Sequence, residues 1–335
     1  MANIFSGLTA YVEEKRYGLD FYTQAVQRND LFPFITTVQG FFPGVKEDTI
    51  KLPNLRAVAG ISSGSTCVSN FDLGNDTTIT QSTISLVKGF VGDEFCPHDG
   101  FETYYTSMGM TAGQKYEGLG AFEAGIFNEI QRRVGARIVQ NAWNGNSSPD
   151  SWTFTGWHDL LLAANMGSAI VGSTTPNSGG TAGTDAQGVY NICQSLIDSA
   201  MANVDFASDI VGGNAYIVMS PQHAEFLRQN YLKLYGQVLQ TPGLASLQAN
   251  SQNVITFPGL PVPIYTQSAL TGTNTIILSR NGNQVLAMDL LSDTTDLQTG
   301  MDQYMEKLWW KFRFKMGVGW RDLTSGSIRY WGPTT

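Results

Sequence analysis

Two short segments contain residue types that could perform covalent chemistry, and the first of them centres on a serine. Gly60-Ile-Ser-Ser-Gly64 matches the pattern G-x-S-x-G, in which the serine of a strand-to-helix turn is the nucleophile of a hydrolase. That turn requires a helix after Ser62, but the following residues 63–70 are poor helix formers. We therefore interpret this segment as the flexible tip of a loop.

The second segment is Cys96-Pro-His-Asp99, whose side chains could bind a metal or supply a thiol nucleophile. Pro97 keeps it extended, and no second pair of ligands with matching spacing occurs elsewhere. A general base would have to come from His98, His158 or His223, the three histidines of the chain. His223 falls in the first turn of a predicted helix, where we interpret it as structural. We expect no catalytic residue, no metal site and no cofactor.

One row of cations could contact phosphates. It alternates with apolar residues near the C-terminus and consists of Lys307, Lys311, Arg313, Lys315 and Arg321. We interpret the row as a solvated or interface-facing edge of a sheet, because charged side chains commonly protect edge strands. The 28 acidic residues outnumber the 20 basic ones, which argues against a protein that grips nucleic acid through a general basic surface. Gly118-Leu-Gly-Ala lacks the third glycine of a dinucleotide-binding loop.

The composition of the 335-residue chain indicates a folded protein with little charge on its surface. Hydrophobic residues make up 42% and charged residues only 14%, against about 25% charged in a typical soluble domain. Disorder requires the opposite balance. No stretch is apolar enough to span a membrane, the N-terminus does not read as a secretory signal, and three scattered cysteines are typical of reduced thiols in a cytosolic setting. A surface this poor in charge is explained if much of it is buried against other copies.

The N-terminal third predicts segments that cannot bury their own apolar groups. Residues 1–44 cluster aromatic side chains around prolines without a helical or strand period. Residues 48–53 and 77–87 alternate polar and apolar residues, which predicts the two strands of a long ribbon with a polar tip. Such a ribbon is marginally stable alone and needs a surface to lie on.

The rest of the chain predicts one long helix, an α/β unit and a closing pair of strands. Apolar residues at steps of three and four predict a helix over residues 117–142. Between residues 150 and 290 we expect helices at 157–164 and 187–203, a buried strand at 215–220 whose Ser220 caps the next helix, strands at 261–266 and 275–279, and a hairpin turn at 281–284. Alternation over residues 310–321 predicts a strand, and a turn at 324–327 predicts that 328–331 returns beside it.

The order of these elements resembles that of the major capsid proteins of tailed bacteriophages, whose shell fold is shared with encapsulins. The segments that carry the resemblance are Thr49-Ile-Lys-Leu-Pro, residues 122–146 ending in Ala-Trp-Asn-Gly-Asn, Ala215-Tyr-Ile-Val-Met-Ser-Pro-Gln-His, Gly259-Leu-Pro-Val, and residues 311–321 with their return strand. The resemblance implies an α+β fold with an N-terminal arm at 1–44, an extended β-hairpin loop at 45–96, a peripheral domain at 97–149 and 290–335 that contains the spine helix at about 117–142, and an α/β axial domain at 150–289.

The same resemblance implies a structural protein that assembles through hexamers and pentamers into the icosahedral head shell around a double-stranded DNA genome. Implied partners are other copies, a separate scaffold protein, a portal protein at one vertex, a decoration protein and, non-specifically, the packaged DNA, with no membrane. The protein would assemble in the bacterial cytoplasm and reside in the virion. We expect contacts between subunits at Phe32, Phe34, Phe41, Phe42, Lys51, Arg56, Lys88, Arg132, Arg133 and Arg137.

Three other interpretations stay open at this point. An encapsulin-like nanocompartment would have the same fold and enclose an enzyme cargo instead of a genome. A hydrolase would use Ser62 or Cys96 with one of the histidines. A tail or fibre protein fits less well, because the 117–142 helix and the α/β unit are not typical of that class.

Overall fold

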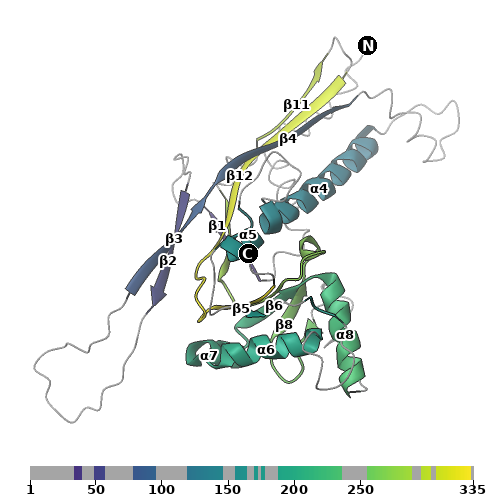
Figure 1. The fold of residues 1–335 in the computed structure, drawn as a ribbon. Helices are drawn as coiled ribbons and strands as arrows, with labels where there is room; N and C mark the ends of the chain where they lie inside the picture. The colour runs from purple at the N-terminus through teal and green to yellow at the C-terminus, as the bar shows by residue number, and fades with distance from the viewer. Residues whose placement is uncertain are drawn as a thin grey trace, which may run out of the picture.

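Three β-sheets and five α-helices organise the part of the chain that the computed structural model describes (Figure 1). These residues are 34–39, 49–56, 78–95, 119–145, 155–163, 170–172, 175–177, 188–235, 255–288, 296–302 and 307–332. Helices and strands are mixed along the chain, so the fold is α+β. None of the helices within these ranges is long and apolar enough to cross a membrane.

A long five-stranded sheet is built around β12 (Lys307–Trp320). Its other strands are β1 (Thr36–Gln39), β4 (Val87–Phe95), β10 (Gln284–Met288) and β11 (Asp296–Asp302). Residues 308–313 of β12 pair with β4 and also with β11, so this strand lies inside the sheet. The alternation at the C-terminus therefore predicts the strand correctly, but the interpretation of its basic row as a sheet edge is wrong.

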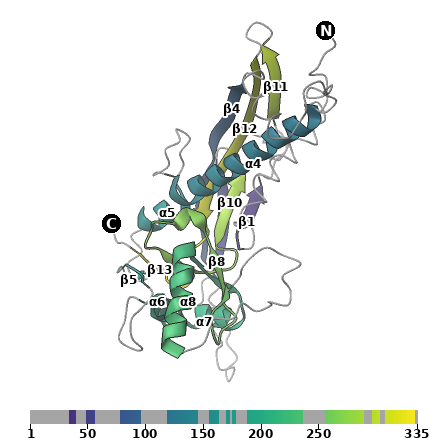
Figure 2. The ribbon, with the colours of Figure 1, turned by 90° about the vertical axis from the view of Figure 1, so that its right-hand side faces the viewer.

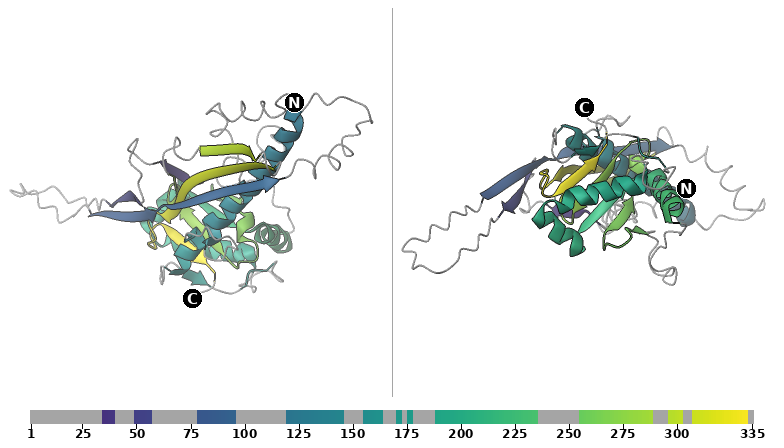
Figure 3. Two further views of the ribbon diagram at one scale, coloured as in Figure 1. Left: turned by 90° about the horizontal axis from the view of Figure 1, so that it is seen from above. Right: turned by 60° about the horizontal axis from the view of Figure 1, so that its bottom comes forward.

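Two shorter strands, β2 (Thr49–Arg56) and β3 (Thr78–Ser85), pair antiparallel and form the ribbon. The predicted pair of strands is confirmed, while residues 57–77 between them lie outside the described residues. After Leu86 the chain continues directly into β4, so one long extended run belongs first to the ribbon and then to the five-stranded sheet (Figure 1). The ribbon projects well away from the rest of the molecule (Figure 3).

The long helix α4 (Leu119–Asn144) confirms the helix predicted at 117–142 and crosses one face of the five-stranded sheet (Figure 2). Its buried residues, Val134, Ile138 and Trp143 among them, share one core with alternate residues of β12, including Trp310, Met316, Val318 and Trp320. Because neighbouring residues of a strand point to opposite faces, the other set of β12 side chains lies on the face away from α4.

A second, six-stranded sheet has the order β5-β13-β9-β6-β8-β7. Its strands are β5 (Ile170–Gly172), β6 (Ala215–Met219), β7 (Ile255–Thr256), β8 (Pro263–Thr266), β9 (Ile276–Arg280) and β13 (Ile328–Trp331), with a 3-10 turn η4 (Ser268–Leu270). Helices α6 (Val189–Met201), α7 (Val204–Val211) and α8 (Pro221–Tyr235) accompany this sheet, whereas the short α5 (Trp157–Ala163) packs mainly on α4 and β12. As predicted, the Ser220 hydroxyl caps α8 by accepting the His223 N–H at 3.1 Å.

The chain crosses from one sheet to the other at two turns, and both correct predicted hairpins. The turn at 281–283 joins β9 of the six-stranded sheet to β10 of the five-stranded sheet, so these strands do not pair. The segment 321–327 likewise joins β12 to β13, which pairs with β9 and β5 instead of returning beside β12. The expected boundary between the axial and peripheral domains at residue 290 does not separate the two sheets. β10, which precedes it, belongs to the five-stranded sheet, and β13, which follows it, belongs to the six-stranded sheet.

Candidate assembly surfaces

The residues considered for covalent chemistry do not form a site in the described structure. Ser62 and Cys96 lie outside the described residues, and so do His98 and Asp99. His158 and His223 are described. The described ranges contain no cluster of three His, Cys, Asp or Glu residues that could hold a metal ion. Cys193 is a free, fully buried thiol, and burial raises its pKa to about 12, which keeps it protonated.

The base of the ribbon lies on the face of the five-stranded sheet opposite α4. Ile50, Leu52, Ile84 and Leu86 form a small core with Val285 and Ala287 of β10. Two glycines of β12 permit this approach. A Cβ on Gly317 would lie 2.3 Å from the Ser85 carbonyl oxygen, and a Cβ on Gly319 would lie 2.5 Å from Cγ1 of Ile84. The Ser82 hydroxyl also donates to the Trp320 carbonyl at 2.9 Å. The spacing of these glycines follows the alternation of the strand, but the sequence does not reveal what they accommodate.

Beyond the ribbon, the same face carries three cations and two open aromatic rings, together with the exposed Glu94 opposite Trp309. We call the cations and rings the basic sheet face: Lys88, Phe90, Trp309, Lys311 and Arg313. Phe90 is 68% exposed and Trp309 is 39% exposed. The Lys311 ammonium lies 5.1 Å from the centre of the Phe90 ring, a cation–π contact. Lys88 and Arg313 are exposed. Large aromatic rings left open beside cations are typical of surfaces that bind another macromolecule.

The outward side of α4 carries three arginines. Arg132, Arg133 and Arg137 are exposed, whereas Val134 and Ile138 of the same helix face the core. The Arg137 guanidinium donates to Gln140 Oε1 at 3.3 Å within the helix. The helix thus presents positive charge on the side away from the five-stranded sheet, opposite to the basic sheet face.

Phe34 is one of the residues expected to contact other subunits, and the structure places it inside its own chain. It is buried in the core of its own chain, with its ring 5.0 Å from that of Tyr216 and 4.8 Å from that of Tyr265. This packing leaves little of its ring for another subunit, because β1 brings the end of the N-terminal segment into the five-stranded sheet beside β10. Phe32, Phe41 and Phe42 lie outside the described residues, and the side chains of Lys51 and Arg56 also lie outside them.

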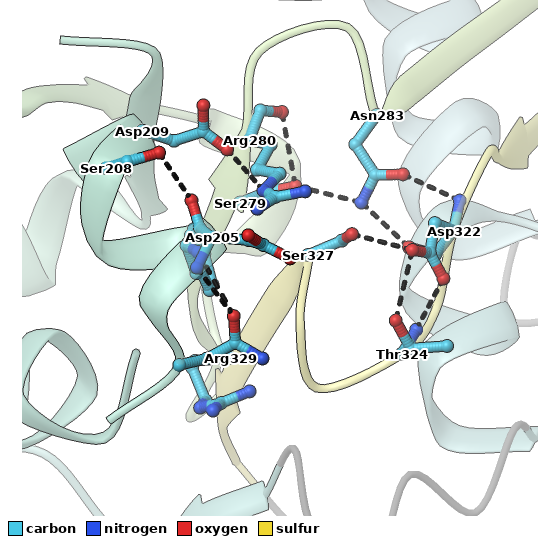
Figure 4. Close-up of polar contacts among 12 residues, drawn as sticks. Asp205, Ser208, Asp209, Ser279, Arg280, Asn283, Asp322, Thr324, Ser327 and Arg329 are labelled. Atoms are coloured by element: carbon cyan, nitrogen blue, oxygen red, sulfur yellow. Dashed lines mark hydrogen bonds and ion pairs between the residues drawn. The ribbon is translucent and has the colours of Figure 1, made fainter. Parts of the chain in front are cut away.

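Polar side chains join the two crossings between the sheets (Figure 4). Asn283 is buried, and its Nδ2 donates to the Asp322 carbonyl at 2.9 Å and to the Ser279 hydroxyl at 3.2 Å. The Asp322 N–H donates to Asn283 Oδ1 at 2.7 Å, and the Ser327 hydroxyl donates to Asp322 Oδ2 at 2.6 Å. These hydrogen bonds connect the two turns that cross between the sheets. Sequence reasoning missed them because turn residues of this kind normally bond locally.

Two arginines fix α7 on the six-stranded sheet. Arg280 pairs with Asp209 at 2.5 Å, and both Arg280 and Arg329 lie over the Phe206 ring, at 5.5 and 6.0 Å. Arg329 is buried, which lowers its pKa, and it donates to the hydroxyl and the carbonyl of Ser199 at the end of α6. A cation at a helix C-terminus satisfies carbonyls that have no partner within the helix.

The opposite side of α7 is open. Val204 and Val211 are 84% and 66% exposed and lie seven residues apart, on the same side of the helix. Asn203 Oδ1 accepts the N–H groups of Asp205 and Phe206 and so caps the helix. A well-anchored helix that presents apolar side chains to solvent is another candidate contact surface.

Comparison with known proteins bears on the fold. No family model matches the chain, and no curated protein matches it by sequence. The capsid of an empty GTA particle, computed with C5 symmetry, superposes with a TM-score of 0.54 at 14% identity, over 93% of this chain and 90% of that chain. The capsid of a native GTA particle gives 0.52 at 15% identity, over 93% and 91%. The chain has the fold of these capsid proteins. The capsid of Myoviridae phage XM1 gives 0.49 at 14% identity, over 94% and 92%.

Proposed function

We propose that this chain is a major capsid protein that assembles with copies of itself into the icosahedral head shell of a tailed bacteriophage. The observation that carries the proposal is a likeness in fold to capsid structures over 93% of the chain. The exposed rings of the basic sheet face and the exposed valines of α7 support it, because both are surfaces that an obligate assembly would bury.

In this proposal the parts of the chain take the roles expected for such a shell. Residues 1–44 are the N-terminal arm, with their end held in the sheet by β1; the ribbon of β2 and β3 is the extended loop; α4 is the spine helix; and α6 to α8 with the six-stranded sheet form the axial domain. Hexamers and pentamers are the assembly units. A separate scaffold protein, a portal, a decoration protein and packaged DNA are the partners, and the shell forms in the bacterial cytoplasm before it becomes part of the virion.

Electron microscopy of the purified protein, alone and with the products of neighbouring genes, tests the proposal. We expect closed shells, and particles isolated from cells should contain DNA. Shells that contain an enzyme instead would identify a nanocompartment. A stable monomer that turns over a small substrate would overturn the shell proposal and favour the hydrolase interpretation, in which Ser62 or Cys96 is the nucleophile.

The arginines of α4 allow a sharper test of contact with the genome. In shells or capsomers, Arg132→Glu, Arg133→Glu and Arg137→Glu together should weaken binding of a duplex DNA fragment. The slope of log K against log salt should fall by about 0.9 for each phosphate contact that is lost. The measurement is a salt titration of DNA binding.

Arg228→Glu is a matched control for Arg137→Glu, because both arginines are exposed on helices and each has an intrahelical partner, Glu225 for Arg228 at 3.5 Å. We expect this control to leave the slope unchanged. If the α4 variants bind DNA as the native protein does and also assemble and package normally, α4 does not face the genome or an acidic neighbour.

A further inference from the structure

Two of the three histidines converge on one buried threonine. Thr275, which is fully buried and directly precedes β9, holds its Oγ1 2.9 Å from Nε2 of His158 in the first turn of α5. The Thr275 backbone also hydrogen-bonds the imidazole of His223 in the first turn of α8. The two histidines are only 8% and 4% exposed. Thr275, the residue just before β9, is therefore contacted by histidines of both α5 and α8.

The surroundings of these imidazoles are almost entirely neutral. From β13, the Tyr330 side chain is buried, which raises the pKa of its phenol and keeps it neutral, and from α8 itself the Phe226 ring lies 6.4 Å from the His223 ring. The charged group that acts on His158 among the described residues is the Asp159 carboxylate on α5, whose Oδ2 also accepts the Gly156 N–H at 3.2 Å. The described parts of α4, α6 and β12 bring no charged group to either imidazole.

His223 has a further property that makes a proton costly. Its Nδ1 is buried and has no hydrogen-bond partner among the described residues. In the neutral imidazole this nitrogen is an acceptor without a donor, whereas protonation turns it into a charged donor without an acceptor, which is costlier to bury. Burial is the main cause that lowers the pKa of both histidines, and it outweighs the opposing effects of Asp159 and of the Thr275 backbone.

We propose that His158, Thr275 and His223 form an acid-sensitive latch that holds α5 and α8 on the start of β9 and loosens when the imidazoles take up protons. The latch lies where the two cores meet, because α5 also packs on α4 and β12 of the five-stranded sheet. Acid would therefore weaken the connection between the two sheets from inside a single subunit. The proposal concerns the single chain and does not depend on the shell function.

The sign of the effect follows from linkage. A histidine whose pKa is lower in the folded state contributes full stability above about pH 6.5, and that contribution is lost as the pH falls toward the folded-state pKa. Each histidine can change the unfolding equilibrium constant by up to about tenfold per pH unit in this window. Both together give up to about a hundredfold per unit. Carboxylates that also titrate in acid are separated from this effect by comparing variants.

The test is urea unfolding of the whole chain between pH 8 and pH 5, for the native protein and for His158→Gln with His223→Gln. We expect the double variant to lose much of the pH dependence between 6.5 and 5, and His98→Gln to keep all of it. Thr275→Val, which removes the hydroxyl beside His158, should lower stability more at pH 8, where the latch is closed, than at pH 5, where it is already loosened. An unchanged pH slope in the double variant overturns the proposal.

A second measurement covers the case in which the double variant does not fold. In the native chain with isotope-labelled histidines, the imidazole signals of His158 and His223 should titrate below pH 6.5, with the His98→Gln spectrum identifying the third signal. Hydrogen exchange of α5 peptides should accelerate in acid more than that of α6 peptides, after correction for the intrinsic pH dependence. Titration of both imidazoles at or above 6.5 contradicts the latch.

Discussion

Replacing Trp157 with alanine is expected to lower the free energy of unfolding by about 3–5 kcal/mol, the range found for truncating a large buried aromatic residue. Trp157 is fully buried and packs edge-on against Trp143, with ring centres 5.3 Å apart. Its Nε1 donates to the carbonyls of Val285 and Gly319 at 3.2 and 3.1 Å, so alanine would leave a cavity and two carbonyls without this donor. Urea unfolding followed by far-ultraviolet circular dichroism measures the loss.

Two further substitutions separate the causes of this effect. Trp157→Phe keeps most of the ring and removes the N–H, and should cost about 1–3 kcal/mol, the penalty of unsatisfied buried acceptors. Trp309→Ala is the matched control, because it removes a tryptophan that is 39% exposed. It should lower the free energy of unfolding by at most about 1 kcal/mol. Equal losses for Trp157→Ala and Trp309→Ala would mean that Trp157 does not anchor α5 to the five-stranded sheet.

Replacing Gly319 with alanine should displace the base of the ribbon and, under the proposed shell function, sharply reduce the yield of closed shells. The new Cβ would lie 2.5 Å from Cγ1 and 2.8 Å from Cδ1 of Ile84, which is buried against this face. Overpacking of this kind costs about 1–3 kcal/mol, roughly 5- to 150-fold in the equilibrium between docked and displaced ribbon. Hydrogen exchange of the β3 peptide and electron microscopy of assembly reactions measure the two consequences.

A second substitution at Ile84 should rescue one glycine variant and not the other, because a Cβ at Gly319 meets the Ile84 side chain and a Cβ at Gly317 meets the backbone of Ser85. Ile84→Ala removes both clashing atoms and leaves Ile84 Cβ, which is 3.8 Å from the new Cβ, so the double variant should regain a docked ribbon. Gly317→Ala should not be rescued in this way, because its Cβ meets the Ser85 carbonyl oxygen at 2.3 Å, and a backbone atom cannot be trimmed. If Ile84→Ala does not rescue Gly319→Ala, Gly319 acts through something other than space for the Ile84 side chain.

The local pattern of residues predicts most individual elements, since helix and strand periods depend on near neighbours. The period of three and four residues locates α4 within two residues at each end, and Ser220-Pro221 marks the start of α8. The alternation of β12 indicates which residues share a face. The residues considered for catalysis cannot be assessed in the same way, because Ser62 and Cys96 lie outside the described residues.

Partners across a sheet are less predictable, because a turn signal does not reveal where the next strand goes. The residues 281–283 and 324–327 have the composition of hairpin turns, yet each carries the chain into the other sheet. Asn283 is a turn residue by composition and becomes a buried link between distant segments only once both crossings are side by side. For the same reason the basic row of β12 suggested an edge strand, although β4 and β11 flank it.

The unbroken course of β3 into β4 has a mechanical consequence. Eight residues of β3 and nine of β4, joined at the buried Leu86, form one rod about 60 Å long at ~3.3 Å per residue. Leu86 sits where this rod leaves the sheet, so it can serve as a fulcrum. A pull on β3, which pairs with β2, would tilt β4 and with it β12, the long strand that packs against α4. Force applied to the ribbon would in this way reach the five-stranded sheet and α4 while every helix and strand stays intact.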